Sequence, residues 1–269
     1  MPLEVQRGCQ GNCVFCDIAS FYRRQNRDIP VRFHSVEYVF SELRSWYEEG
    51  WRSFALYSDN VLAQPDFFYE LASRCERDGL RVSFSLSSRP DDILRAREKI
   101  AEIAAYRHVR IARVEIGFEA ATEKLLRLLG KGTTPEDNEA VFAFFAELAQ
   151  KTGREIEIGV DFILLAHPEM SFEDLVEQVR FVGRHMPLDQ EFAPLVVPYP
   201  GTPLHRYFAA KGYEEDPERG FVIPYHFEDP QVEAFAQRLR HLSRVELVRR
   251  LRLVASSPDL ADRLRYGRW

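Results

Sequence analysis

Short apolar stretches alternate along the chain with stretches of helical spacing, and this order predicts repeated strand and helix units. The helix expected near the N-terminus shows the spacing well: apolar side chains recur from Val36 to Tyr47, Ser35 is a suitable N-cap, and Gly50 follows the last turn. Strands are expected at 3–6, 53–58, 81–88, 110–119, 155–165 and 192–199. Helices are expected at 35–49, 64–78, 91–106, 135–150 and 171–185.

Six strand and helix units predict an α/β fold with a parallel sheet. The nearly continuous apolar stretch 160–165 is typical of a strand covered by helices on both faces. Strands joined by helical crossovers form either an open sheet or a curved, barrel-like one, and the pattern does not choose between them. Both arrangements bring the carboxyl ends of the strands to the functional edge. No strand is expected after residue 201, so we predict a core at 1–204 and a mostly helical cap at 205–269.

Composition and charge narrow the class of protein. Of 269 residues, 45% are hydrophobic, which suffices for a large core, and no apolar stretch approaches the roughly 20 residues that span a bilayer. With no leader-like segment, a cytoplasmic location without a membrane partner is expected. The net charge of -6 argues against general nucleic-acid binding. The segment 231–269 is positively charged instead, with nine arginines against four acidic residues. It is either a solvated helical face or a docking surface for an anionic partner.

Three of the four cysteines lie close together after the first predicted strand. Cys9, Cys13 and Cys16 occur in the stretch RGCQGNCVFC, whose glycines and asparagine allow a tight loop, while Cys75 is distant in sequence. This spacing argues against a disulfide framework and favours metal in a reducing compartment. Three thiolates can hold three irons of a cubane cluster and leave the fourth iron open for chemistry.

A structural zinc site is the alternative for the same cysteines. Such a site normally uses four nitrogen or sulfur ligands, and here only Cys75 or a histidine such as His34 could complete it. Cys75, however, lies on the apolar face of a predicted helix, where a thiol is expected to act as a small buried hydrophobe.

The cysteine loop resembles that of the radical S-adenosylmethionine (SAM) superfamily, which has the spacing CxxxCxxC and an aromatic residue before the last cysteine, here Phe15. The resemblance implies a partial (β/α)6 TIM-like barrel and a [4Fe-4S] cluster bound by Cys9, Cys13 and Cys16. It further implies that SAM chelates the open iron and is cleaved reductively to a 5'-deoxyadenosyl radical, which abstracts hydrogen from a substrate. An external donor such as a flavodoxin or ferredoxin would supply the electron.

Further motifs extend the resemblance over about residues 4–204, nearest to the subgroup of cobalamin-dependent enzymes and methylthiotransferases. In that subgroup, Asp59 of the stretch YSDN would hold the SAM amino group, although an ordinary turn explains it equally. Arg89 of RPD would pair with a carboxylate of SAM or substrate; the alternative is a surface arginine beside an N-capping Asp91. Glu119 of GFE would face the SAM pocket as a cofactor-binding or catalytic group.

Three later features complete the candidate site. Lys131, in LGKGTT, matches a lysine of the subgroup and would bind the cofactor, but a helix end with a basic last turn has the same composition. The stretch 198–204, PYPGTPL, would shape the pocket wall. At the exit of the fifth strand, relatives carry glycines where this chain has LAHPEM. His167 could there transfer protons or orient a substrate, the alternative being a structural histidine.

The remaining chain limits the expected chemistry. The cysteine-bearing strand lies at the start of this sequence and only Cys75 is left over, so we expect no N-terminal cobalamin domain and no second cluster. Hydrogen abstraction from a small molecule or modified peptide is expected, leading to rearrangement, elimination, epimerisation, dehydrogenation or methyl transfer. Methyl transfer ranks last because it would need cobalamin bound in some other way. Two rival hypotheses are a zinc-stabilised binding module with an arginine-rich partner surface and a cluster and SAM scaffold without turnover.

Overall fold

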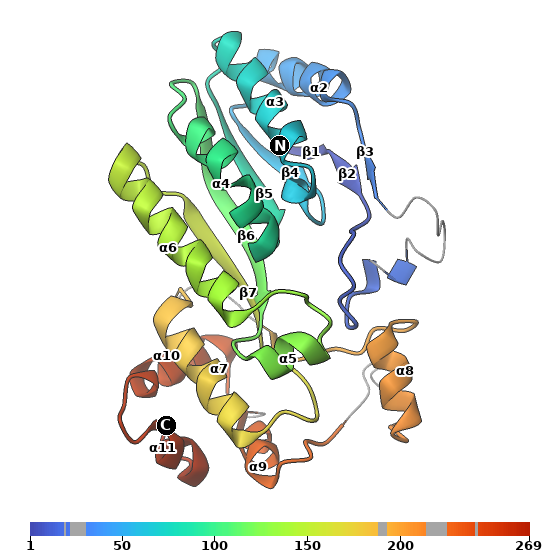
Figure 1. Cartoon of the computed structure of the whole chain (residues 1–269), viewed down its shortest axis with the longest axis vertical. Helices are drawn as coiled ribbons and strands as arrows, with labels where there is room; N and C mark the ends of the chain where they lie inside the picture. Colours follow the sequence, from blue (N-terminus) through green and yellow to red (C-terminus); the bar gives the residue numbers. More distant parts are fainter. Residues whose placement is uncertain (19, 22–30, 188–192, 214–224, 240–241) are drawn as a thin grey trace. The chain divides into compact units, whose positions relative to one another are not determined.

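The computed structural model describes residues 1–18, 20–21, 31–187, 193–213, 225–239 and 242–269. It has a parallel six-stranded sheet in the order β1-β4-β5-β6-β7-β8 and a small antiparallel pair, β2-β3 (Figure 1). The strands are β1 Pro2–Glu4, β2 Gln6–Arg7, β3 Arg32–Phe33, β4 Ser53–Tyr57, β5 Val82–Ser88, β6 Val109–Glu119, β7 Glu157–Leu165 and β8 Ala193–Leu195. The predicted α/β class is confirmed.

Helices follow the strands as the sequence pattern predicts. They are α2 Val36–Glu48, the 3-10 helix η1 Val61–Ala63, α3 Pro65–Arg77, α4 Pro90–Ala104, α5 Glu123–Leu128, α6 Pro135–Thr152, α7 Phe172–His185, α8 Pro203–Ala210, α9 Pro230–Leu239, α10 Arg244–Ala255 and α11 Leu260–Tyr266. The predicted N-cap Ser35 accepts a hydrogen bond from the Tyr38 backbone N–H. The sequence pattern missed the short elements β2, β3, η1 and α8, because two to eight residues carry little periodic signal, and it indicated α5 only through its end near Gly130.

The last strand is shorter than predicted. Residue 192 lies outside the described residues, and β8 ends at Leu195 instead of residue 199. One more backbone bond runs from the Val196 N–H to the Leu165 carbonyl. Pro198 and Pro200 then lack the N–H donors that would continue the pairing.

The chain divides into two compact units. The first consists of Met1–Gln10, Phe21–Gly117 and Glu136–Gly159, and the second of Gly11–Ser20, Phe118–Pro135 and Val160–Trp269. Strands β6 and β7 each continue in sequence from one unit into the other. The division at residue 204 that the sequence predicts remains a prediction.

In the first unit, β4 and β5 bury only one face. Side chains alternate strictly, so that Phe54 and Phe84 are buried whereas Ser53 and Ser85 are at least partly accessible. Helix α3 packs against both α2 and α4 (Figure 1). The burial on both faces that the stretch 160–165 indicates therefore does not extend to β4 and β5, whose second face carries serines in β5 and the exposed Tyr57 in β4.

In the second unit, α7 packs against α9, α10 and α11 (Figure 1). Its N-terminus carries a capping box between Ser171 and Asp174. Gly183 allows close approach, since a Cβ there would lie 2.1 Å from the Cβ of Ala255. In the core of this unit Phe162 and Phe181 stack at a centroid distance of 4.7 Å. These contacts hold the carboxyl end of β7.

Several arginines of the segment 231–269 have structural partners. Arg238 donates to the carbonyl of Leu264 at 3.2 Å, and Arg252 donates to that of Met186 at 2.8 Å. Arg263 pairs with Asp259 at 2.9 Å. This supports the interpretation of the segment as a helical face with local charge pairs.

No helix among the described residues is long and apolar enough to cross a membrane.

Candidate functional site

The cysteine loop is anchored at Val14, which follows Cys13, within the second unit. The Val14 N–H donates to the Leu129 carbonyl at 2.9 Å, and the Val14 carbonyl accepts from the Leu204 N–H at 2.9 Å. A Cβ on Gly130, whose φ is +62°, would lie 2.9 Å from the Asn12 carbonyl oxygen. The two stretches that the sequence predicts near the cofactor, 129–134 and 198–204, therefore both contact this loop.

The three clustered cysteines form no disulfide and are partly accessible. Cys13 and Cys16 belong to the second unit, where the Cys16 N–H donates to the Cys13 carbonyl at 3.3 Å, and Cys9 belongs to the first unit. Phe15, between them, is half-buried. Nowhere in the described ranges are three His, Cys, Asp or Glu side chains grouped closely enough to hold one metal ion. The donor set itself, three accessible thiols without disulfides, has the chemistry that an iron–sulfur cluster requires.

Cys75 differs from these cysteines as predicted. It is fully buried in α3. Burial, and secondarily the nearby Asp78 carboxylate, raise the pKa of its thiol to about 12. A thiol that stays protonated at neutral pH is a poor metal ligand, which weakens the four-ligand zinc alternative.

Two predicted site residues, Glu119 and Lys131, meet in the second unit. Lys131 Nζ lies 3.2 Å from Glu119 Oε1, with side-chain exposures of 4% and 14%. Glu119 has a φ of 66°, unusual for a residue with a side chain, and Gly130 and Gly132 flank Lys131 with φ of 62° and 75°. The alternative interpretation of this stretch as a helix end also holds, because α5 ends at Leu128 and Gly130, with its positive φ, precedes Lys131. Strained backbone beside a buried ion pair is typical of binding sites.

Thr133 is a residue that the sequence argument missed. Its side chain is 6% exposed, and within the described part of the chain its hydroxyl has no hydrogen-bond partner. A buried hydroxyl without a partner marks a place for a further polar group. The only signal in the sequence was its position two residues after Lys131.

Asp59 and Arg89 lie at strand ends of the first unit. Arg89 is largely buried, and its Nε lies 3.0 Å from Asp91 Oδ1. The N-cap of α4 is Arg89 and its first residue is Pro90, so the expected N-capping role of Asp91 is wrong. The fixed φ of proline suits the first helical position, which moves the helix start one residue forward. Asp59 is half-buried directly after β4.

His167 lies at the exit of β7 in a polar cluster of the second unit. Its Nδ1 accepts from the Glu169 N–H at 3.2 Å, which leaves Nε2 as the protonated nitrogen of the neutral ring. The Tyr207 hydroxyl donates to Glu169 Oε1 at 2.5 Å, and the Tyr207 ring lies 5.0 Å from the imidazole. Burial lowers the pKa of His167 below its usual value, while burial and then Glu169 raise the pKa of Tyr207 to about 12. His167 is therefore held neutral in one orientation.

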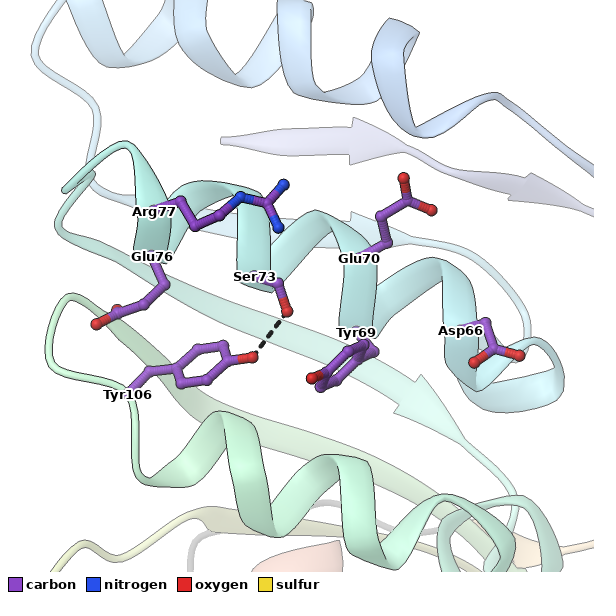
Figure 2. A pocket seen from close by; sticks show the side chains of 7 residues that line it. All are labelled: Asp66, Tyr69, Glu70, Ser73, Glu76, Arg77 and Tyr106. Carbon is purple, nitrogen blue, oxygen red and sulfur yellow. Dashed lines mark hydrogen bonds between the residues drawn. The ribbon is translucent and has the colours of Figure 1, made fainter.

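A pocket of about 490 Å³ lies elsewhere in the first unit, between α3 and the segment after α4 (Figure 2). Within it the hydroxyls of Ser73 and Tyr106 are 2.7 Å apart, and Glu76 accepts from backbone N–H groups at the start of β6. None of the predicted site residues lines it. The lining residues are Asp66, Tyr69, Glu70, Ser73, Glu76, Arg77 and Tyr106.

Comparison with known proteins identifies a family. Residues 3–182 match the family model described as the Radical SAM superfamily. An uncharacterized methyltransferase of Pyrococcus horikoshii is 29% identical over 208 residues, which are 76% of this chain and 41% of that protein. A putative methylthiotransferase of Methanocaldococcus jannaschii is 27% identical over 210 residues, 75% of this chain and 43% of that protein.

The fold also matches a solved structure. The cobalamin-dependent S-adenosylmethionine radical enzyme OxsB, with aqua-cobalamin bound, superposes with a TM-score of 0.68 at 14% identity, over 98% of this chain and 46% of that one. The chain thus spans less than half the length of these relatives. At such low identity the superposition shows a shared fold, in agreement with the predicted TIM-like barrel.

Proposed function

The chain belongs to the radical SAM superfamily, and from this premise we propose that it is an enzyme in which Cys9, Cys13 and Cys16 hold a [4Fe-4S] cluster. With SAM bound, that cluster supplies the family's chemistry, the reductive formation of a 5'-deoxyadenosyl radical that abstracts hydrogen. One observation carries the proposal: three partly accessible cysteines occur in a CxxxCxxC loop, and both the N–H and the carbonyl of Val14, between the last two cysteines, form backbone hydrogen bonds. The proposed catalytic core is 1–204, with 205–269 as a helical cap.

The remaining predicted residues would bind and orient SAM. Lys131 and Glu119 present a cation and an anion side by side in a buried setting, which suits a ligand that carries both a carboxylate and an amino group. Asp59 would receive the amino group and Arg89 a carboxylate. Phe15, next to Cys16, would contact the bound cofactors. The sequence motifs carry these roles. Asp59 and Arg89 lie in the first unit, and Glu119 and Lys131 lie in the second.

His167 would act on the substrate. Its neutral ring offers a hydrogen-bond donor at Nε2, and the contacts with Glu169 and Tyr207 keep that orientation. With its proton on Nε2 and its Nδ1 lone pair bonded to the Glu169 N–H, the ring can donate a hydrogen bond that orients a polar group of the substrate. The substrate class is a small molecule or modified peptide, and the electron comes from an external donor protein.

Methyl transfer is a second candidate for the overall reaction. Two curated relatives are named as a methyltransferase and a putative methylthiotransferase, and OxsB is cobalamin-dependent. SAM labelled in its methyl group, incubated with and without cobalamin and candidate substrates, tests this candidate. Label in the product only when cobalamin is present supports it, and label recovered entirely in methionine, with none in the product, excludes it.

Anaerobic reconstitution with iron and sulfide tests the main proposal. The wild-type protein should acquire about four irons and the brown absorption of a [4Fe-4S] cluster, and should release 5'-deoxyadenosine when reduced with SAM. Cys13→Ala should lose the cluster, whereas Cys75→Ala should keep it. Stoichiometric zinc without iron would favour the binding-module hypothesis, and a cluster that never yields 5'-deoxyadenosine would favour the scaffold.

A further inference from the structure

A buried polar network joins strand and helix ends in the first unit. Gln6 begins β2, Ser58 and Asn60 follow β4, Ser88 ends β5, and Asp92 lies in the first turn of α4. Apart from the half-buried Ser58, the members are at most 4% exposed. None of them belongs to the site residues that the sequence predicts. We call these five residues the Asn60 network.

Asn60 is the centre of this network. Its Nδ2 donates to Asp92 Oδ2 at 2.5 Å, and its Oδ1 accepts from the Ser88 hydroxyl at 3.0 Å. Its backbone N–H lies 3.1 Å from the Ser58 hydroxyl oxygen and 3.3 Å from Gln6 Oε1. Because Asn60 is fully buried, each of these bonds is costly to leave unmade. The side chain therefore fixes the ends of β4, β5 and α4 against one another.

The orientation of the Gln6 amide follows from the same contacts. The Asn60 backbone N–H can only donate, so the Gln6 oxygen must face it, and this oxygen also accepts from the Ser58 hydroxyl. Gln6 Nε2 is then left without a partner among the described residues, although it is buried. A buried, unpaired donor of this kind requires a group that completes it.

The network flanks the residues that we propose bind the cofactors. Asp59 lies between Ser58 and Asn60, and Arg89 follows Ser88. Each proposed ligand-binding side chain is thus attached to backbone that the network holds in place. A shift of either strand end would move the side chain away from its ligand by a comparable distance.

We propose that Asn60 is a positioning residue for SAM, which holds Asp59 and Arg89 in their binding geometry through its bonds to Ser88 and Asp92. This inference rests on the proposed function. Pre-organisation of this kind lowers the cost of ordering the binding groups when the ligand arrives.

Exchange of the hydrogen-bond partners tests the proposal. Asn60→Asp places a carboxylate against that of Asp92, so the SAM dissociation constant of the cluster-loaded protein should rise at least about tenfold. The double variant Asn60→Asp/Asp92→Asn restores one donor and one acceptor with unchanged total charge. It should recover affinity to within about threefold of the wild type. Equilibrium dialysis with labelled SAM gives the constants, and the change in the EPR signal of the reduced cluster on adding SAM gives an independent readout.

Ser88→Ala and a matched control complete the design. Ser88→Ala removes a single hydrogen bond and should weaken SAM binding about threefold to fivefold even if Asn60→Asp fails to fold. Asp66→Asn, an exposed residue of α3 paired with Lys99 at 3.0 Å, should bind SAM like the wild type. Iron content and cooperative thermal unfolding report whether each variant is intact.

The outcomes separate the two proposals. Folded, cluster-loaded Asn60→Asp or Ser88→Ala with wild-type SAM affinity would overturn the positioning role, as would a double variant that stays as weak as Asn60→Asp. In both cases the proposed function stands. If the cluster-loaded wild type itself binds no SAM, the proposed function fails and the positioning role fails with it.

Discussion

At the scale of single residues, Glu119 carries an unusual combination of features. It ends β6 with a φ of 66°, a conformation that costs a residue with a side chain about 1 kcal/mol or more, and it forms a buried ion pair with Lys131. Neither feature stabilises the fold by itself. The backbone conformation costs free energy, and the lost hydration of the two charges offsets much of their attraction. A strand end that combines this backbone conformation with a buried ion pair is expected where the two side chains also bind a ligand.

Breaking the Glu119–Lys131 pair should destabilise the protein. Lys131→Met leaves the carboxylate of Glu119 buried without its cation, and we expect the free energy of unfolding to fall by about 3 kcal/mol. Urea denaturation measures this loss. The double variant Lys131→Met/Glu119→Gln removes both charges and should recover more than half of it. A loss below about 1 kcal/mol for Lys131→Met would show that water already solvates the pair.

Cys75 should differ chemically from the other three cysteines. Burial raises the pKa of its thiol to about 12, so at pH 8 it is protonated and inaccessible to reagents. Iodoacetamide should label up to three cysteines in the native apo-protein and the fourth only in denaturant, as determined by mass spectrometry. Labelling of Cys75 under native conditions would contradict its assignment as a core residue.

The same shift predicts a pH dependence of stability. The unfolded thiol ionises near its ordinary value of 9.0, whereas the folded thiol keeps its proton until about pH 12. Below pH 9 the raised pKa has no effect; above it the unfolded state is favoured by up to about 1.4 kcal/mol per pH unit. The free energy of unfolding of the wild type, relative to Cys75→Ala, should therefore fall between pH 9 and pH 11. A constant difference would contradict the shift.

At the scale of elements, the cysteine loop depends on two segments far away in sequence. Val14 is bonded to Leu129 after α5 and to Leu204 in the first turn of α8. Gly130 lies so close to the loop that a side chain would contact the Asn12 carbonyl. The turn after α5 and the start of α8 therefore shape the loop, even though neither contributes a metal ligand.

Gly130→Ala should impair cluster loading. The new Cβ would lie 2.9 Å from the Asn12 carbonyl oxygen and 3.2 Å from Val14 Cγ1, so the loop must shift. We expect less than half of the wild-type iron content after reconstitution, measured by iron analysis and visible absorption. Gly79→Ala is the matched control, since Gly79 has a similar φ of +68° but no atom within 4 Å of its Cβ. It should pay the same backbone strain of about 1 kcal/mol and keep its iron. Equal iron loss in both variants would refute a specific role for the contact.

At the scale of the whole molecule, the basic C-terminal segment is a local exception in an acidic chain. The chain carries a net charge of -6, and several arginines of segment 231–269 bind carbonyls or neighbouring carboxylates. In the pocket shown in Figure 2, the hydroxyls of Ser73 and Tyr106 likewise bond to each other, and Glu76 accepts from the His108 N–H. The features that point to a ligand lie instead at the carboxyl ends of the strands and beside the cysteine loop.

SAM should stabilise the protein only when the cluster is present. A ligand that binds the folded state at 100 times its dissociation constant adds about 2.7 kcal/mol, which should raise the melting temperature by several degrees. Thermal unfolding of the reconstituted wild type with and without SAM measures the shift, and Cys13→Ala is the control. The same shift in Cys13→Ala would mean that SAM binds independently of the cluster.

Much of this architecture was predictable from local pattern. The five longest predicted helices and the six main strands occur where period and capping residues indicate them, because burial on one side of an element imposes its own spacing on the sequence. The family that the cysteine loop suggests is also the one whose model matches residues 3–182. The short strands β2 and β3 escaped prediction, as did the end of β8, because they depend on pairing with distant segments.

The sequence by itself therefore determined the strand and helix order, the family and the identity of the clustered cysteines, all of which depend on neighbours along the chain. Only the tertiary structure decided which side chains meet. It paired Lys131 with Glu119, buried Asn60 between Ser88 and Asp92, and anchored Val14 to Leu129 and Leu204. These contacts join residues 12 to 190 positions apart, and local periodicity carries no information about such partners. The burial that makes each contact matter is likewise a property of the folded chain.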